Sequence, residues 1–486
     1  MTEALQNILS YQADNPLMFN SKLFWILFVV FLPFYGLLRL SSHRRAMLAY
    51  VIAFSLFFYY KASGWCCILL IARAVVDYYL VKMLDESPDP RFRKAMLILS
   101  LVTSVGTLAF FKYGHFALLN IETAIGNNFQ PMDIVLPVGI SFYTFQSVSY
   151  AVDVYKRKSA RAESLLDYLF YLSFFPYIAA GPIVRAATFL PQIRQNRKIT
   201  EAMVFSGLWL VITGLVKKSI IADYLAQYND LIFSMPSGYS GFECLMGVVG
   251  YSMQIFCDFS GYSDIAIGLA RIMGFDLGIN FRSPYKSLNI TDFWHRWHIS
   301  LSSWLRDYVY IPLGGNRKGE MRRCVNLMLT MLVGGIWHGA GWNFLIWGGL
   351  HGAGLVAHKI YMREKPAKGN GVTKFLSWLL TFSFVTLLWI LFRTSTLQEA
   401  MELFGSIFLS FRVDMVLPFL SERAGWSAMF ALSILLVFLP VKFYKFLETR
   451  FIASRLWVKL IVFICVVQSI LEFSNSDILP FIYFQF

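Results

Sequence analysis

Histidines suited to acid–base chemistry are concentrated in one stretch of the sequence, from Asn289 to His351. This stretch holds four of the seven histidines, namely His295, His298, His338 and His351. From Cys324 to His358 there is no Lys, Arg, Asp or Glu. An ionisable group in such an apolar run is costly to expose to lipid, so we expect it to face a protein interior or a wet cavity. Residues 289–351 are therefore the predicted functional site.

The composition predicts a membrane protein with many spans. Of the 486 residues, 57% are hydrophobic, 17% aromatic and only 15% charged, whereas soluble domains carry about 25% charged residues. The formal net charge is +14, but the basic residues cluster between apolar runs, at 43–45, 156–158, 317–323 and 359–374. This pattern is typical of cytoplasmic loops that obey the positive-inside rule, so we expect no nucleic-acid partner.

The apolar runs predict an all-α polytopic protein with about eleven transmembrane helices of about 15 to 20 residues, the length that a bilayer requires. The runs are Leu23–Leu38, Ala46–Tyr60, Trp65–Leu84, Ala95–Phe111, Ile134–Val152, Ala202–Val216, Phe375–Phe392, Leu397–Phe411, Ala424–Val441 and Trp457–Leu471, besides those discussed below. No long linker or internal repeat divides the sequence. We therefore expect one integral-membrane domain, residues 1–486, with a polar N-terminal segment at 1–20 and the central catalytic stretch at 289–351.

Two apolar segments carry signals of irregular structure. Tyr168–Val184 contains two prolines and Gly181, which predict a broken helix that enters a cavity. Glu243–Met273 is long and contains Gly261 as a possible break, together with the charged residues Asp258, Asp264 and Arg271. Two interpretations of this second segment stay open: two helices joined by a polar turn, or a polar lining that faces inward.

The first central motif, DFWHRWHISLSSWLRDYVYIPLGG, is too charged and too aromatic for a lipid-exposed span. It predicts a helix that lies in the membrane interface or dips into a funnel. Residues three or four apart share a helix face, which would place His295, His298 and Ser302 together. An HxxH pair completed by His338 or His351 also raises the possibility of a zinc site. That spacing alone is weak evidence, and no carboxylate lies beside His338, so no metal is predicted.

The second central motif is GGIWHGAGW, in which four glycines surround His338. Glycines allow close approach of helix backbones and leave room for a narrow ligand. No serine or cysteine occurs nearby at a recognisable nucleophile elbow, so base catalysis by His338 on a bound hydroxyl fits better than a catalytic triad. A buried histidine beside small residues also occurs as a purely structural residue, and that alternative stays open.

At these motifs the chain resembles the membrane-bound O-acyltransferase (MBOAT) family, in particular its bacterial branch that includes the membrane proteins of alginate O-acetylation and of teichoic acid D-alanylation. Further matching segments are PVGISFYTFQSVSYAVDVYKR at 137–157, FFPYIAAGPIVR at 174–185, DFSGYSDIAIGLARIMGF at 258–275, FRSPY at 281–285 and the terminal FIYFQF. The resemblance implies a ring of tilted helices around a central funnel. It also implies that His338 is catalytic and that His298 is its partner across a tunnel. His295 departs from the family pattern and receives no role.

The implied activity is transfer of an acyl group, most simply acetyl from acetyl-CoA, toward hydroxyls of a cell-envelope or exported polysaccharide. Further candidates for the substrate path or tunnel are Trp294, Trp337, Arg306 and Asp307. The resemblance implies a bacterial inner-membrane location and a separate extracytoplasmic hydrolase-like partner. It implies no tightly bound cofactor, with the acyl thioester serving as substrate.

Two other classes of function are considered. Broken helices and the aspartates Asp258 and Asp264 would suit a secondary transporter that exports a sugar or an acyl-bearing substrate. Transport without acyl transfer would favour that hypothesis. A non-catalytic scaffold of an export complex would instead assemble normally, and acylation would persist, after changes at His338.

Overall fold

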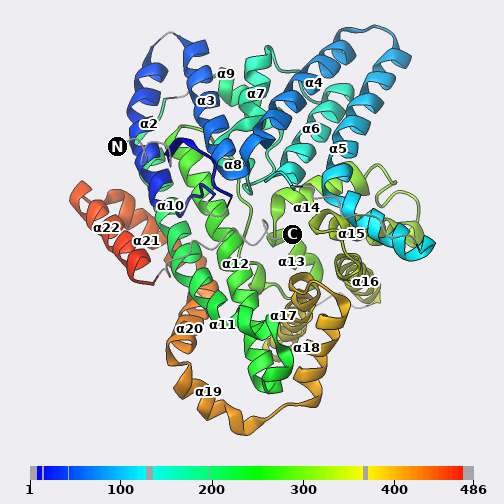
Figure 1. Ribbon diagram of the computed structural model, residues 1–486, viewed down its shortest axis with the longest axis vertical. Helices are drawn as coiled ribbons and strands as arrows, with labels where there is room; N and C mark the ends of the chain where they lie inside the picture. The colour runs from blue at the N-terminus through cyan, green and yellow to red at the C-terminus, as the bar shows by residue number, and fades with distance from the viewer. Residues whose placement is uncertain are drawn as a thin grey trace. The chain divides into compact units, whose positions relative to one another are not determined.

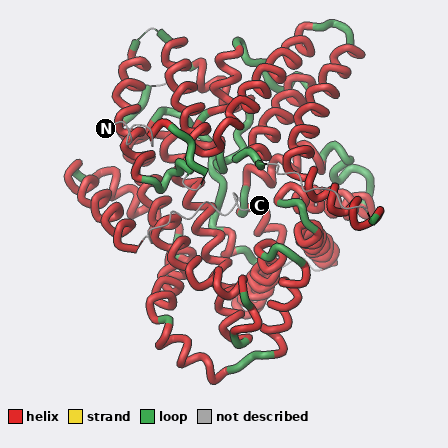
Figure 2. The backbone as a smooth tube through the Cα atoms, in the orientation of Figure 1, coloured by secondary structure: helices red, strands yellow, loops and turns green. Residues whose placement is uncertain are grey.

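The computed structural model describes residues 8–13, 16–41, 43–126, 135–195, 198–364 and 370–473. Within these ranges every regular element is a helix and no strand occurs (Figures 1 and 2), which confirms the all-α class. Part of the predicted N-terminal segment at 1–20 and the whole of the terminal FIYFQF motif lie outside the described residues.

Four of the described helices are long and apolar enough to cross a membrane, or up to six if each of two sharply bent pairs forms one span. Three of them are α2 (Lys22–Leu40), α5 (Pro90–Ile125) and α17 (Gly371–Arg393), and the fourth candidate runs over Glu201–Ser234. The protein is thus a multi-pass membrane protein, but the predicted count of about eleven spans is not confirmed. Several of the predicted runs form helices that are too short or too polar to qualify.

The helix α4 (Cys67–Glu86) shows how charged residues enter an apolar run. Arg73 and Asp77 lie one turn apart in it, and both are buried. Arg73 donates a hydrogen bond to Asp77, and the Tyr168 hydroxyl donates a second one to the same carboxylate over 3.1 Å. A buried charge is tolerated when it is paired and hydrogen-bonded, so these residues pack inward as a satisfied group.

By its contacts the chain divides into two compact units, each built from two stretches of sequence. The first unit comprises Met1–Val211 and Ser263–Gly278, and the second comprises Ile212–Tyr262 and Ile279–Phe486. The single functional domain expected for residues 1–486 stays a prediction.

The first unit is a helical assembly around an aromatic core. Besides α2, α4 and α5 it contains α3 (Arg44–Ser63), α6 (Ile140–Tyr155), α7 (Leu165–Ser173), α8 (Phe175–Ile178) and α9 (Ala186–Arg194). The rings of Phe24, Phe28, Phe31 and Phe175 lie within 6.2 Å of one another in successive pairs. The broken helix predicted at Tyr168–Val184 is confirmed, because α7 ends at Ser173 and α8 lasts only four residues.

The helix α12 (Gly241–Ile272) excludes one of the two interpretations left open for the segment Glu243–Met273. It is one continuous helix of 32 residues, so the first of these interpretations, two helices joined by a turn, is wrong. Glycine serves close packing here: a Cβ atom at Gly261 would lie 2.8 Å from the carbonyl oxygen of Gly214. The charge of Asp258 needs no turn because Lys218 lies 2.6 Å away and pairs with it.

The second unit carries the central stretch on four helices. They are α13 (Ile290–Arg296), α14 (Ile299–Leu305), α15 (Glu320–His338) and α16 (Trp342–Glu364). The rest of the unit comprises the π-helical turn Val216–Ala222, α11 (Asp223–Ser234), α17, α18 (Leu397–Leu409), α19 (Val416–Glu422), α20 (Ala424–Phe438), α21 (Val441–Ala453) and α22 (Leu456–Phe473). The helix α10 (Glu201–Leu215) continues into that turn, and as far as Val211 it belongs to the first unit.

Two glycines bring the backbones of α15 and α16 into direct contact. A Cβ atom at Gly335 would lie 2.3 Å from the carbonyl oxygen of Phe344, and one at Gly348 would lie 2.5 Å from that of Met331. Real Cβ atoms do not approach so closely, so only glycine fits at either position. We call this contact the glycine seam. It holds the end of α15, where His338 lies, against the first turns of α16.

Candidate active site

The chain breaks between α13 and α14, at the place where one helix was expected. Trp297 is extended, and His298 adopts the left-handed conformation with φ 43° and ψ 56°, which is uncommon for a residue other than glycine. The predicted shared face of His295, His298 and Ser302 is therefore wrong. His295 is exposed whereas His298 is fully buried, so the two rings do not face one ion as the zinc hypothesis requires.

Asn280 holds the ring of His298 in place. Its amide oxygen lies 3.1 Å from His298 Nδ1 and also accepts hydrogen bonds from the backbone N–H of Ser300 (3.2 Å) and the Ser300 hydroxyl (2.9 Å). A backbone N–H can only donate, so the Asn280 atom facing it is the oxygen. His298 Nδ1 therefore carries the proton, and Nε2 is the basic nitrogen of the ring. Strained backbone of this kind often occurs at functional sites.

His298 is electrically neutral in this environment. It lies outside the helices long enough to span a membrane. Burial disfavours the charged imidazolium and lowers the pKa of His298 to about 3. The Phe259 ring packs edge-on against the imidazole, with centroids 4.6 Å apart. A neutral imidazole with a fixed tautomer can accept a hydrogen bond at Nε2 and so orient a hydroxyl or a water molecule.

His338 ends α15 and is 4% exposed. Three aromatic rings surround it: Trp337 at 4.9 Å, Trp347 at 5.1 Å and Phe392 at 5.0 Å between centroids. The Trp337 ring also lies 6.0 Å from that of His298. The structure therefore brings the two predicted histidines to one tryptophan, although 40 positions separate them in the sequence (338 − 298 = 40).

The other candidates fall into two groups. Trp294 lies in the same cluster, because its ring is 5.8 Å from that of Trp347. Arg306 and Asp307 pair with each other over 2.8 Å in a π-helical turn, and the Arg306 side chain is 63% exposed. They lie outside the aromatic cluster, and a role for them in substrate orientation stays a prediction.

Sequence reasoning missed Asn280 and Trp347 and left the role of His351 open. Trp347 and His351 are four residues apart on α16, so helical spacing was a usable signal for their shared face. Asn280 gave no such signal. Its importance arises from a contact with His298 that only the folded chain creates.

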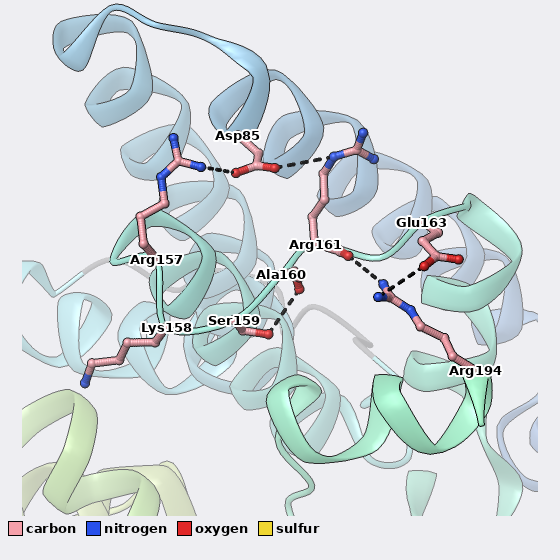
Figure 3. A pocket seen from close by; sticks show the side chains of 8 residues that line it. All are labelled: Asp85, Arg157, Lys158, Ser159, Ala160, Arg161, Glu163 and Arg194. Atoms are coloured by element: carbon pink, nitrogen blue, oxygen red, sulfur yellow. Dashed lines mark hydrogen bonds and ion pairs between the residues drawn. The ribbon is translucent and has the colours of Figure 1, made fainter. Parts of the chain in front are cut away.

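A separate open pocket in the first unit contains none of the predicted residues (Figure 3). Its cavity volume is about 550 Å³ and its lining residues are Asp85, Arg157, Lys158, Ser159, Ala160, Arg161, Glu163 and Arg194. Each guanidinium there pairs with a carboxylate: Arg157 and Arg161 with Asp85, and Arg194 with Glu163. Ion pairs that are at least partly exposed to solvent, as these are, contribute little to stability, and we interpret the pocket as a surface charge network.

Comparison with known proteins identifies the family of this chain. The model of the membrane-bound O-acyltransferase family, MBOAT, matches residues 157–393, a range that contains His298 and His338. The peptidoglycan O-acetyltransferase of Helicobacter pylori is 37% identical over 426 residues, which cover 82% of this chain and 81% of the relative. The probable alginate O-acetylase AlgI of Pseudomonas putida is 34% identical over 498 residues, covering 97% and 100%. The teichoic acid D-alanyltransferase of Bacillus subtilis is 29% identical over 268 residues, covering 52% and 68%. The chain therefore belongs to the membrane-bound O-acyltransferase family and is an O-acyltransferase.

Proposed function

We propose that this O-acyltransferase moves acetyl groups from acetyl-CoA toward hydroxyls of a cell-envelope polysaccharide. The main support for this proposal is the buried cluster in which the rings of His338 and His298 both lie next to the ring of Trp337. Two relatives that each align with more than four-fifths of this chain are named for O-acetylation of peptidoglycan and of alginate. These names support acetyl as the acyl group and a glycan as the acceptor.

In the proposed mechanism His338 is the general base. It removes the proton from an acceptor hydroxyl while the oxygen attacks the thioester carbonyl carbon. A C–O bond forms and the C–S bond breaks. The proton on His338 then passes to the leaving sulfur, so that CoA departs as a thiol and the histidine returns to its neutral form. His298, neutral and held by Asn280, accepts a hydrogen bond at Nε2 and orients the hydroxyl.

The acceptor polymer can be identified by measuring the O-acetyl content of each envelope polymer in a strain that lacks this protein. We expect O-acetyl groups to disappear from one polymer and to persist on the others. Mass spectrometry of muropeptides measures peptidoglycan, and base-released acetate measures exported polysaccharide. Re-expression of the intact chain should restore the lost groups. Unchanged acetylation of every polymer would contradict the proposal.

We further propose that the enzyme lies in the bacterial cytoplasmic membrane, where a cytosolic thioester can reach it, and that a separate extracytoplasmic hydrolase-like protein completes transfer to the polymer. The intact chain, purified into lipid nanodiscs and supplied with acetyl-CoA and polymer, is then expected to leave the polymer largely unacetylated. Addition of a periplasmic extract should start polymer acetylation. Efficient acetylation of polymer by the purified chain alone would remove the need for a partner.

The transporter hypothesis receives less support from the buried carboxylates. Asp258 pairs with Lys218 over 2.6 Å, and Lys218 also lies 2.8 Å from Asp223. A carboxylate that is neutralised by a fixed cation is better suited to holding helices together than to carrying a substrate or a proton through the membrane.

A further inference from the structure

Three aromatic rings form a compact group next to His338. Trp294 comes from α13, while Trp347 and His351 lie one turn apart on α16. The ring centroids are 4.6 Å apart for Trp347 and His351, 5.1 Å for Trp294 and His351, and 5.8 Å for the two tryptophans. All three side chains are buried, and His351 is 0% exposed. We call these three residues the indole–imidazole group.

The polar atoms of this group are enclosed, but the described part of the chain offers them no hydrogen-bond partner. This holds for the indole N–H of Trp294, the indole N–H of Trp347 and both ring nitrogens of His351. Buried polar atoms are almost always satisfied in native proteins. Four such atoms in three touching rings therefore indicate that something other than these side chains binds there.

Two other buried tryptophans of the same unit have hydrogen-bond partners within the protein. The indole N–H of Trp389 donates to the Tyr285 hydroxyl over 3.2 Å, and that of Trp426 donates to the Leu225 carbonyl oxygen over 3.3 Å. The indole–imidazole group differs from these two tryptophans because its polar atoms have no such partner among the described residues. The group lies next to the candidate base, since the His338 ring is 5.1 Å from that of Trp347.

The chemistry of the group defines the ligand. An indole N–H can only donate, and a neutral imidazole offers one donor and one acceptor. The group therefore presents three donors and one acceptor, which suits a ligand atom with lone pairs, such as a carbonyl oxygen. The remaining ring contacts of His351 are the apolar rings of Phe293 and Phe384. Such surroundings favour a neutral ligand over an anion.

We propose that the indole–imidazole group binds the carbonyl oxygen of the acyl group and holds it beside His338. This inference rests on the proposed acyl transfer and gives that site its acyl-recognition residues. The indole N–H groups of Trp347 and Trp294 and the imidazole N–H of His351 donate to the acyl oxygen. His351 is then a substrate-binding residue with no part in moving the proton.

The test compares two probes that differ at this oxygen. Acetyl-CoA has the carbonyl, and S-ethyl-CoA replaces it by CH₂. Their dissociation constants are measured with the full chain in lipid nanodiscs. We expect the intact protein to bind acetyl-CoA at least about tenfold more tightly, the worth of three neutral hydrogen bonds. The variants Trp347→Phe and His351→Phe keep a ring and remove the polar atoms. In both, the ratio of the dissociation constant of S-ethyl-CoA to that of acetyl-CoA should fall toward one.

Trp426→Phe is the matched control because it also replaces a buried tryptophan of this unit by phenylalanine. The indole N–H of Trp426, however, donates a hydrogen bond to the Leu225 carbonyl oxygen. It should keep the wild-type ratio and lower the melting temperature more than Trp347→Phe does. A ratio in Trp347→Phe and His351→Phe equal to that of the intact protein would overturn the inference. So would a wild-type ratio near one, or binding of neither probe.

The failure of this inference is distinguishable from failure of the proposed function. If His338→Ala abolishes acetylation while both ring variants keep the wild-type ratio, the transfer proposal stands and the acyl pocket is wrong. If His338→Ala keeps full acetylation, the transfer mechanism itself fails, whatever the probe ratio.

Discussion

Cells in which His338 is replaced by alanine are expected to lose O-acetylation of the acceptor polymer almost completely. Removal of a positioned general base costs about 10²- to 10⁴-fold in rate. His338 occupies the centre of the site, since its ring contacts Trp337, Trp347 and Phe392. The measurement is the acetyl content of each envelope polymer, together with the amount of the variant in the membrane.

His295→Ala is the matched control for this experiment. It removes a histidine of the same central stretch, but one whose side chain is exposed. We expect His295→Ala to keep wild-type acetylation. The general-base role would be refuted if His338→Ala, present at the wild-type level, left the acetyl content of every polymer unchanged. His338 would then be a packing residue.

The second large effect is expected at Lys218, in the π-helical turn Val216–Ala222. Lys218 is 4% exposed and pairs with both Asp258 and Asp223. Lys218→Met keeps much of the side-chain volume but leaves two carboxylates without their cation. Breaking a buried ion pair from one side costs about 3–5 kcal/mol. We therefore expect little folded protein in the membrane and a strongly lowered melting temperature in detergent.

Two further variants separate the ion pair from other causes. Lys217→Met changes the neighbouring, partly exposed lysine and should have a much smaller effect. Adding Asp258→Asn to Lys218→Met removes one stranded charge and should restore part of the stability. If Lys218→Met were as stable as Lys217→Met, the buried carboxylates would not depend on this cation. The exporter hypothesis would then regain support.

The sequence predicted the fold best where a single local signal decides the outcome. The apolar run Leu23–Leu38 corresponds to α2, Lys22–Leu40, because an uncharged run of that length is stable in the membrane only as a helix. The break after α7 was also predictable, since prolines and Gly181 exclude a regular helix there.

The errors arise where a distant partner changes a local preference. Gly261 and Asp258 indicated a break in α12, but a glycine can serve close packing and a carboxylate can be paired by Lys218 from another helix. His298 was assigned to a helix face by its spacing. Its real position depends on Asn280, which anchors the ring and thereby favours a left-handed residue. No local pattern encodes such a contact.

The glycine seam has a consequence for how this enzyme can diversify. The contacts at Gly335 and Gly348 are between backbones, so no rotamer change can absorb an added methyl group. The spacing between the His338 end of α15 and Trp347 on α16 is thus set by main-chain geometry. If the acyl group binds there as proposed, variation in its size is expected to depend on side chains outside the seam, such as Trp294 on the short helix α13. Substitutions that change the specificity of the enzyme are therefore expected outside Gly335 and Gly348.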